Sequence, residues 1–398
     1  MAIPTRISAG IAIKRKKKIE NIDEKWYNYY MFRDDLKFVP IYVPGKPIEE
    51  TIKEYGLKKK DVIKLASNEN PLGPSPLALK AITDNLDKIH LYPESDSQNL
   101  RISLSEKLGL NINEIIIGRG SDEVIQILSK AVLNKGDEII VSQPTFSVYE
   151  IAGVIMGACI QKVPLKEDLT QDLDGILEKI SNKTRLIYLT NPHNPTGSLN
   201  KKDDVEKFLE KIPENIFVVM DEAYCEYVEC KDYPDSLAFM RGKYKNVIGM
   251  RTFSKIYGLA GLRLGYGFSL NQELISAMYR VKEPFNVSNL AQFAGIASLR
   301  DADQVIRSRE LNSAGKIYLT ENLKDIGLTP YKTESNFILV NTDRAVKQLT
   351  ESLLKRGMII RNCTSFGLET CFRVTISTFE DNVKLIDLLK DIIVKNEW

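Results

Sequence analysis

The sequence predicts an α/β fold, in which helices sandwich a mostly parallel sheet and a smaller α+β unit follows. Short apolar runs typical of buried strands alternate with helical patterns between residues 114 and 268. Polar and glycine-rich turns follow the ends of these runs. In parallel sheets covered by helices, ligands bind beyond the carboxyl ends of the strands. The pattern therefore predicts a ligand crevice at that edge of the sheet.

The expected elements also predict the domain organisation. Strands are expected at residues 62–66, 114–117, 138–141, 162–165, 185–190, 217–220, 247–250 and 264–268. A helical stretch over 276–300, broken at Pro284, and a helix over about 305–323 then lead into strands near 337–340, 358–360 and 372–376 and a closing helix from 381. We expect an extension over 1–34, an arm over 35–75 joining the small domain, a large domain over 76–300 and a small domain over 301–398.

Composition excludes several classes of protein. The 398 residues are 43% hydrophobic and 27% charged with a net charge of +2, which gives no reason to expect nucleic-acid or membrane partners. The two histidines argue against a zinc site or a Ser-His-Asp triad. The five cysteines form no CxxC pair and are odd in number, which indicates a reducing, cytoplasmic compartment.

The first 30 residues differ from the rest of the chain. A weakly apolar stretch over residues 7–13 precedes the basic run at 14–18, whereas a secretory signal has the opposite order. A nucleic-acid arm is one interpretation of the basic run, and a solvated, poorly ordered extension is the one we prefer. We expect the native start at Met31.

The segment RTFSKIYGLAGLRLGYG, residues 251–267, holds the central candidate residues. Lys255 is expected in a glycine-containing loop between two strands, where a partly desolvated amine can form a Schiff base. Ser254 and Arg263 add a hydroxyl and a planar cation, a pair suited to a phosphate. Pyridoxal phosphate (PLP) is a ligand that carries both a carbonyl group, for the lysine, and a phosphate, for the serine and arginine. A surface lysine is the alternative interpretation of this residue.

Two further loops suit the same cofactor. Gly118–Asp122 forms a glycine loop entering a helix, with Ser121 as the expected N-cap, and helix N-termini bind phosphate. Phe146 follows the end of a strand and could stack on a ring. A tight connection and a core aromatic are the corresponding alternatives.

Polar residues after later strands complete the candidate site. Asp221 directly follows an apolar strand, as a carboxylate paired with the protonated pyridine nitrogen of PLP should. Tyr224 and Asn194 could donate to the ring oxygen of PLP. Arg361 and Arg373, on neighbouring strands of the small domain, could bind the substrate's anionic group. A turn aspartate and exposed edge arginines are the alternatives.

With these residues the chain resembles the PLP-dependent aminotransferases of fold type I, and within them the histidinol-phosphate aminotransferases. The resemblance runs from about residue 38 to the C-terminus. It is carried by YVPGKPIEE, KLASNENPLGPSP, YPE, GRGSDE, QPTF, TNPHNPTG, DEAYCEY, RTFSKIYGLAGLRLGYG, ESNFILV and CFRVTIST.

The resemblance implies a role for each candidate residue. Lys255 would hold PLP and shuttle a proton, Asp221 would pair with its ring nitrogen, and Tyr224 and Asn194 would contact its ring oxygen. The cofactor phosphate would be bound by Ser121, Asp122, Ser254 and Arg263, with Phe146 stacked on the ring. Tyr92 would reach the cofactor of a second subunit, which makes a homodimer. Arg361, Arg373 and Asn194 would bind the substrates.

The implied reaction interconverts histidinol phosphate and 2-oxoglutarate with imidazole-acetol phosphate and glutamate. A threonine-phosphate decarboxylase and an aromatic amino acid aminotransferase of the same fold remain open, and a non-enzymatic regulator is a third class. Three residues depart from the usual pattern. His193 replaces asparagine, Phe146 replaces tyrosine, and Asn362 replaces aspartate after Arg361.

Overall fold

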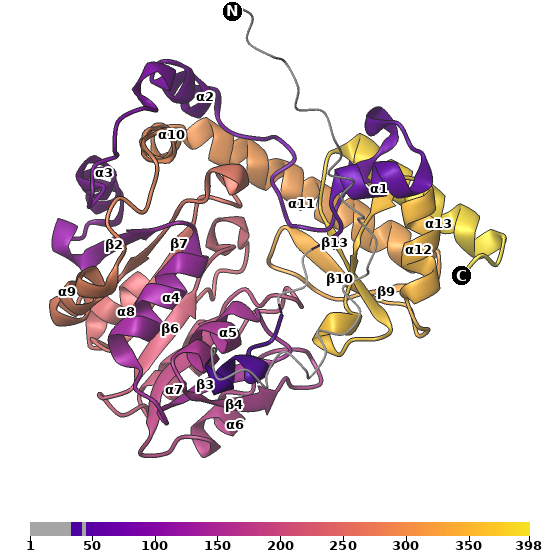
Figure 1. Ribbon diagram of the computed structural model, residues 1–398. Coiled ribbons are helices and arrows are strands. Elements are labelled where there is room, and N and C mark those ends of the chain that lie inside the picture. Colours follow the sequence, from indigo (N-terminus) through magenta and orange to yellow (C-terminus); the bar gives the residue numbers. More distant parts are fainter. Residues whose placement is uncertain (1–32, 42–44) are drawn as a thin grey trace, which may run out of the picture.

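A computed structural model describes residues 33–41 and 45–398 and contains a seven-stranded and a four-stranded sheet (Figure 1). The larger sheet comprises β2 (Ile115–Gly118), β3 (Glu138–Gln143), β4 (Cys159–Pro164), β5 (Thr184–Thr190), β6 (Phe217–Asp221), β7 (Val247–Thr252) and β8 (Gly265–Phe268), in the order β2-β8-β7-β6-β5-β3-β4. Strands β3 to β7 pair in parallel, and β8 is antiparallel to β2 and β7. The predicted α/β fold is confirmed, whereas the antiparallel strand was not foreseen. The expected start at Met31 lies outside the described residues.

Helices cover both faces of the larger sheet and bury two hydrophobic cores. One core includes α2 (Pro76–Thr83), α3 (Gln98–Leu108), α6 (Leu173–Glu178), α7 (Lys202–Leu209), α8 (Ser236–Gly242) and α10 (Asn289–Leu299). The other includes α4 (Ser121–Val132), α5 (Val148–Ile155) and α9 (Gln272–Val281). Along β5, Ile187 and Leu189 enter the first core, and Leu186 and Tyr188 enter the second. This alternation explains why the strand is apolar throughout.

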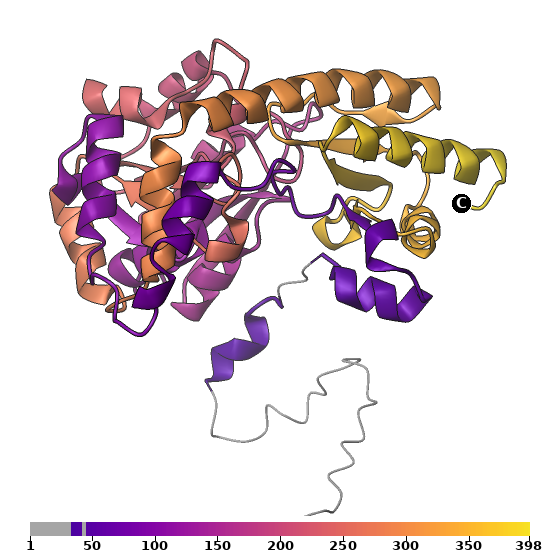
Figure 2. The ribbon, with the colours of Figure 1, turned by 90° about the horizontal axis from the view of Figure 1, so that it is seen from above.

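The smaller sheet packs against three helices. Its strands are β9 (Thr329–Pro330), β10 (Phe337–Asn341), β12 (Arg361–Asn362) and β13 (Cys371–Thr375), all antiparallel, in the order β12-β13-β10-β9. The helices are α11 (Ala302–Asp325), α12 (Lys347–Lys355) and α13 (Phe379–Val394). The long helix α11 runs from the larger body of the molecule to the smaller sheet (Figure 2).

The segment before the larger sheet also attaches to this smaller half. After α1 (Ile48–Tyr55), strand β1 (Ile63–Lys64) pairs in parallel with β11 (Met358–Ile359). The backbone of Thr375 then donates to the carbonyl of Leu65 at 2.8 Å. The chain stays bonded to the smaller half as far as Asn68, whose backbone bonds Thr375 and Asn336, and passes into the larger half from there.

One predicted helix is interrupted more widely than expected. Helix α9 ends at Val281 and α10 begins at Asn289, so the break at Pro284 spans a whole loop. Phe285 in this loop has a left-handed φ of 55°. Proline disfavours helical geometry in the residue before it, which accounts for the early end of α9. In the part of the chain that the structure describes, the helices are too short or too polar to span a bilayer.

Candidate active site

A cavity of about 630 Å³ opens at the carboxyl ends of the parallel strands, between the two sheets. Every predicted site residue except Tyr92 lines it: Ser121, Asp122, Phe146, Asn194, Asp221, Tyr224, Ser254, Lys255, Arg263, Arg361 and Arg373. These residues follow β2, β3, β5, β6 and β7 of the larger sheet or lie on β12 and β13 of the smaller one. The order of the strands reverses between β3 and β5, which is where an open α/β sheet forms its ligand crevice.

Lys255 lies in the loop between β7 and β8 and points into the cavity. Its Nζ is 3.1 Å from the carbonyl oxygen of Ser67 and 5.7 Å from the ring centroid of Tyr224. Burial, together with the positive charge of Arg373, lowers the pKa of the Lys255 amine to about 8. The lowered pKa increases the share of neutral amine near physiological pH, and the neutral form can act as a nucleophile or a base.

Asp221 is the last residue of β6 and is almost fully buried. Its Oδ2 accepts a hydrogen bond from the Tyr149 hydroxyl at 2.6 Å, and its Oδ1 accepts one from the Ala223 backbone at 3.1 Å. Burial raises the pKa of Asp221 to about 6, while the two hydrogen bonds oppose that shift. A buried carboxylate of this kind is suited to a cationic partner inside the cavity.

Tyr224 and Arg373 are held by residues of both halves of the molecule. The Asn68 side-chain amide donates to the Tyr224 hydroxyl at 3.0 Å. Arg373 donates to the Asn194 side-chain oxygen and, at 3.3 Å, to the carbonyl of Ala66, while its buried Nε has no hydrogen-bond partner among the described residues. The cavity is thus lined by donors that could bind anionic groups.

The beginning of α4 forms one end of the cavity. Gly120, not Ser121, occupies the N-cap position, so the expected cap is wrong by one residue, and Ser121 is the first residue of the helix. The φ of Gly120 is 78°, a left-handed value that suits glycine. Arg263 lies beside it and pairs with Asp122 at 2.8 Å.

The remaining predicted residues lie around the cavity wall. The Arg361 guanidinium is 5.3 Å from the Phe366 ring centroid. Arg361 on β12 lies directly opposite Arg373 on the antiparallel strand β13. Phe146 packs with its ring edge-on to Tyr149 at 5.7 Å. Ser254 is buried, directly before Lys255. All of them face the same space.

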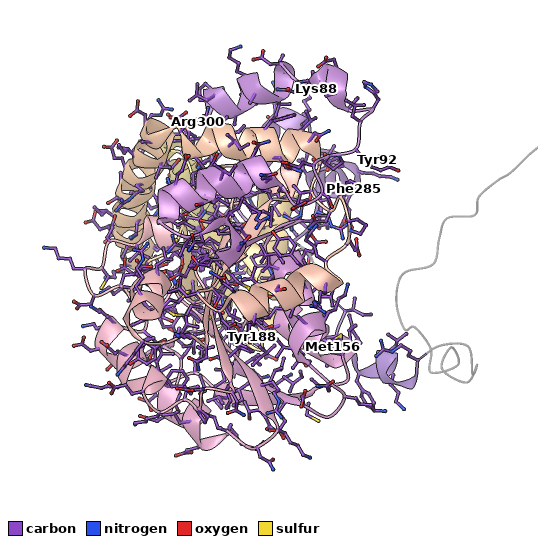
Figure 3. All side chains as sticks on the ribbon, turned by 90° about the vertical axis from the view of Figure 1, so that its left-hand side faces the viewer. Lys88, Tyr92, Met156, Tyr188, Phe285 and Arg300 are labelled. Atoms are coloured by element: carbon purple, nitrogen blue, oxygen red, sulfur yellow. The ribbon has the colours of Figure 1, made fainter. Side chains whose placement is uncertain are left out.

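Tyr92 lies outside this cavity. It is 83% exposed, and its ring lies 5.0 Å from that of Phe285 at the surface of the larger half (Figure 3). Both residues are in loops next to α10, and Tyr92 lines a second cavity of about 340 Å³ with neighbouring apolar residues. Within one chain, therefore, Tyr92 does not meet the other predicted residues.

Sequence reasoning missed two residues at the site. Tyr149 reads as an ordinary core aromatic of α5, because its hydroxyl partner Asp221 is distant in sequence. Asn68 belongs to a turn cluster, and its contact with Tyr224 gives no sequence signal.

His193, which stands beside Asn194 where the family usually has asparagine, is fully buried and bonds Thr196 at 2.9 Å. Burial lowers the pKa of His193 to about 3. It therefore acts as a neutral structural residue.

Comparisons with known proteins identify the family. The model of "Aminotransferase class I and II" matches residues 60–389. The chain belongs to the class I and II aminotransferase family. Histidinol-phosphate aminotransferase from Moorella thermoacetica is 46% identical over 91% of this chain and 92% of its own length. The enzyme of that name from Caldicellulosiruptor saccharolyticus is 40% identical over 91% of this chain and all of its own length.

A solved structure of an aminotransferase shares the fold. Histidinol-phosphate aminotransferase from Sinorhizobium meliloti, in complex with pyridoxal-5'-phosphate, superposes with a TM-score of 0.84 at 26% identity, covering 92% of this chain and 99% of the other. The predicted fold type is thereby confirmed.

Proposed function

We propose that this aminotransferase uses PLP to interconvert histidinol phosphate and 2-oxoglutarate with imidazole-acetol phosphate and glutamate, a step of histidine biosynthesis. One observation supports this above all others. The amine of Lys255, the carboxylate of Asp221 and the guanidinium of Arg373 line a single cavity, in a chain that is 46% identical to a histidinol-phosphate aminotransferase.

The residues present fit PLP. Two glycines let β8 and the Arg263 guanidinium approach the start of α4 closely, because a Cβ on Gly265 would lie 2.5 Å from the Ser121 nitrogen and one on Gly120 would lie 2.7 Å from the Arg263 guanidinium. The first turn of a helix offers backbone N–H groups and the positive end of its dipole, which suits a phosphate. Together with Ser254 and Arg263, this end of the cavity would hold the cofactor phosphate.

The other end of the cofactor would lie between the strand ends. Asp221 would pair with the ring nitrogen, Tyr224 and Asn194 would donate to the ring oxygen, and Phe146 would stack on the ring. When bound, PLP withdraws electrons from the substrate's reacting carbon. Lys255 would anchor the cofactor and, once its amine is released, would carry a proton at Nζ to and from that carbon.

The substrates' anionic groups would be bound by Arg361 and Arg373. Arg373 is 6% exposed, and its guanidinium lies 4.8 Å from the Phe337 ring centroid. This packing orients the planar fork of nitrogens that suits a phosphate or a carboxylate. The two arginines would accept the phosphate of histidinol phosphate in one half-reaction and a carboxylate of glutamate in the other.

We further propose a homodimer in which Tyr92 reaches the cofactor of the partner subunit. The exposure of Tyr92 supports this, as does the group of exposed apolar side chains near it: Leu86, Ile89, Leu91 and Phe285. Contiguous exposed apolar surface is typical of protein interfaces. Sedimentation of the purified protein would test the dimer, and a monomer would contradict it.

The division into an extension, an arm, a large domain and a small domain also remains our proposal, as does a cytoplasmic location. All five cysteines are free thiols, which suits a reducing compartment. Cell fractionation would test the location.

Histidinol phosphate alone provides the test of function. We would add it, without keto acid, to the purified PLP-loaded enzyme and follow the visible absorption of the cofactor. Conversion to the pyridoxamine form, followed by glutamate formation when 2-oxoglutarate and histidinol phosphate are both supplied, is the expected result. An unchanged spectrum would overturn the proposal. Release of carbon dioxide from threonine phosphate would then identify a decarboxylase.

A further inference from the structure

The buried tyrosine behind Asp221 has a defined direction of hydrogen bonding. The Tyr149 hydroxyl lies 2.6 Å from Oδ2 of Asp221 and 2.9 Å from Oγ1 of Thr190. A phenol has one proton, and an ionised carboxylate can only accept. Thr190 therefore donates to Tyr149, and Tyr149 donates to Asp221. The three side chains form a series of donors that ends on the carboxylate.

Packing fixes the position of Tyr149. Its ring stacks on Tyr188 with centroids 4.3 Å apart and planes at 17°, and Phe146 meets it edge-on. Tyr149 is fully buried on α5, at the edge of the cavity. A ring held on two sides has little freedom to turn its hydroxyl away from Asp221.

The backbone of Thr190 is held by the side chain of Gln171, which takes the place of pairing with β3. The pairing of β3 with β5 ends at Ile140 and Ile187. Beyond that point the Gln171 side chain donates to the Thr190 carbonyl at 3.1 Å and accepts from the Thr190 backbone nitrogen at 3.2 Å. Gln171 thus fixes the end of β5 where the two strands separate and the cavity opens.

The ionised form of Asp221 depends on these donors, because burial and nearby negative charges disfavour a charged carboxylate at this position. The titratable groups that act on it are Tyr149 on α5, Asp122 on α4 and the adjacent Glu222, whereas Tyr188 on β5 is itself affected by the charge of Asp221. Burial is the main cause of its raised pKa, and the charges of Asp122 and Glu222 add to the shift. The hydrogen bonds from Tyr149 and Ala223 act in the opposite direction and favour the ionised form.

We propose that Tyr149 is a positioning residue whose hydroxyl keeps Asp221 ionised and oriented, so that the carboxylate keeps the ring nitrogen of PLP protonated. This inference rests on the proposed function, in which Asp221 faces that nitrogen. The Tyr149 hydroxyl donates to Asp221, so its loss should change the electronic state of the ring more than substrate binding.

The test is the ¹⁵N NMR signal of PLP labelled at its ring nitrogen and bound to the enzyme. Tyr149→Phe should shift this signal towards the unprotonated position, weaken PLP binding roughly ten- to hundredfold, and lower kcat with little change in KM. Tyr188→Phe is the matched control, because it removes a buried hydroxyl from the ring stacked on Tyr149. The control should leave the signal in place.

The outcomes separate this inference from the proposed function. If Asp221→Asn shifts the signal and Tyr149→Phe does not, the role of Tyr149 is overturned. If neither shifts it, the assignment of Asp221 itself fails. Should Tyr149→Phe not fold, Thr190→Val should shift the signal in the same direction and Thr190→Ser should not. An unchanged signal in Thr190→Val would then count against the inference.

Discussion

The Nζ atom of Lys255 lies 3.1 Å from the carbonyl oxygen of Ser67, and this contact joins the two halves of the molecule. Lys255 belongs to the loop after β7 of the larger sheet. Ser67 follows β1, which pairs with β11 in the smaller half. The amine is therefore positioned by groups on both sides of the cavity, and this position makes it the residue whose replacement is most informative.

Lys255→Ala should abolish turnover. The variant loses both the covalent anchor of PLP and the base that moves the substrate proton, so we expect kcat to fall by about 10⁴-fold or more. Glutamate formation from histidinol phosphate and 2-oxoglutarate is the measurement. Lys243→Ala is the control, since Lys243 is an exposed residue paired with Glu210 at 3.2 Å. Activity retained in Lys255→Ala would contradict the mechanism.

The pH dependence of cofactor capture should report the lowered pKa of Lys255. The neutral amine is the reactive form, and its pKa lies at about 8. Below that pH the rate at which the apoprotein binds PLP covalently should rise about tenfold per pH unit, and above it the rate should level off. Stopped-flow absorbance after mixing apoprotein with PLP measures this rate.

A free amine supplies the comparison for that profile. The side chain of Nα-acetyl-lysine has an ordinary pKa of about 10.4, so its reaction with PLP should keep accelerating to about pH 10. If the protein and the free amine give the same profile, then burial and Arg373 do not lower the pKa of Lys255.

Arg373→Lys should weaken binding of both substrates. Lysine has the charge but not the planar fork, and it cannot reproduce the contacts of Arg373 with Asn194 and the Ala66 carbonyl. We expect KM for histidinol phosphate and for 2-oxoglutarate to rise roughly ten- to hundredfold. The visible spectrum of bound PLP should persist. Arg280→Lys, at an exposed position of α9, should behave as wild type, and equal KM values in both variants would refute the role of Arg373.

Much of the fold was predictable because each strand of the larger sheet carries a local signal. A strand such as β6 is buried on both faces, so its residues are apolar throughout and Asp221 stands out at its end. The direction of β8 was not predictable in the same way. Its pairing with β2 and β7 depends on contacts between distant segments, which leave no pattern within the strand itself.

The site residues differ in the same way, because some carry a local sequence signal and others do not. Lys255 and Arg263 share one motif, so their proximity follows from the sequence. Tyr149 and Asn68 reach the site through hydrogen bonds to residues 72 and 156 positions away, and their types are common in cores and turns. The role proposed for Tyr92 cannot be read from one chain, because it needs a partner subunit.

Gly265→Ala should disturb the phosphate end of the cavity. The added Cβ would lie 2.5 Å from both the Gly120 carbonyl carbon and the Ser121 nitrogen, which are backbone atoms and cannot turn aside. We expect a loss of about 1–3 kcal/mol in the free energy of unfolding, together with weaker PLP binding, because the start of α4 must shift. Denaturant unfolding of the apoprotein and titration with PLP measure the two effects.

Gly261→Ala is the matched control, in the loop that leads into β8. A Cβ at that position meets no atom within 4 Å, and the residue is exposed. The stability and the PLP affinity of Gly261→Ala should equal those of the wild type. If Gly265→Ala also binds PLP normally while it loses stability, the start of α4 does not hold the cofactor phosphate. If the two variants are indistinguishable in both measurements, the close approach of β8 to Gly120 and Ser121 has no energetic consequence.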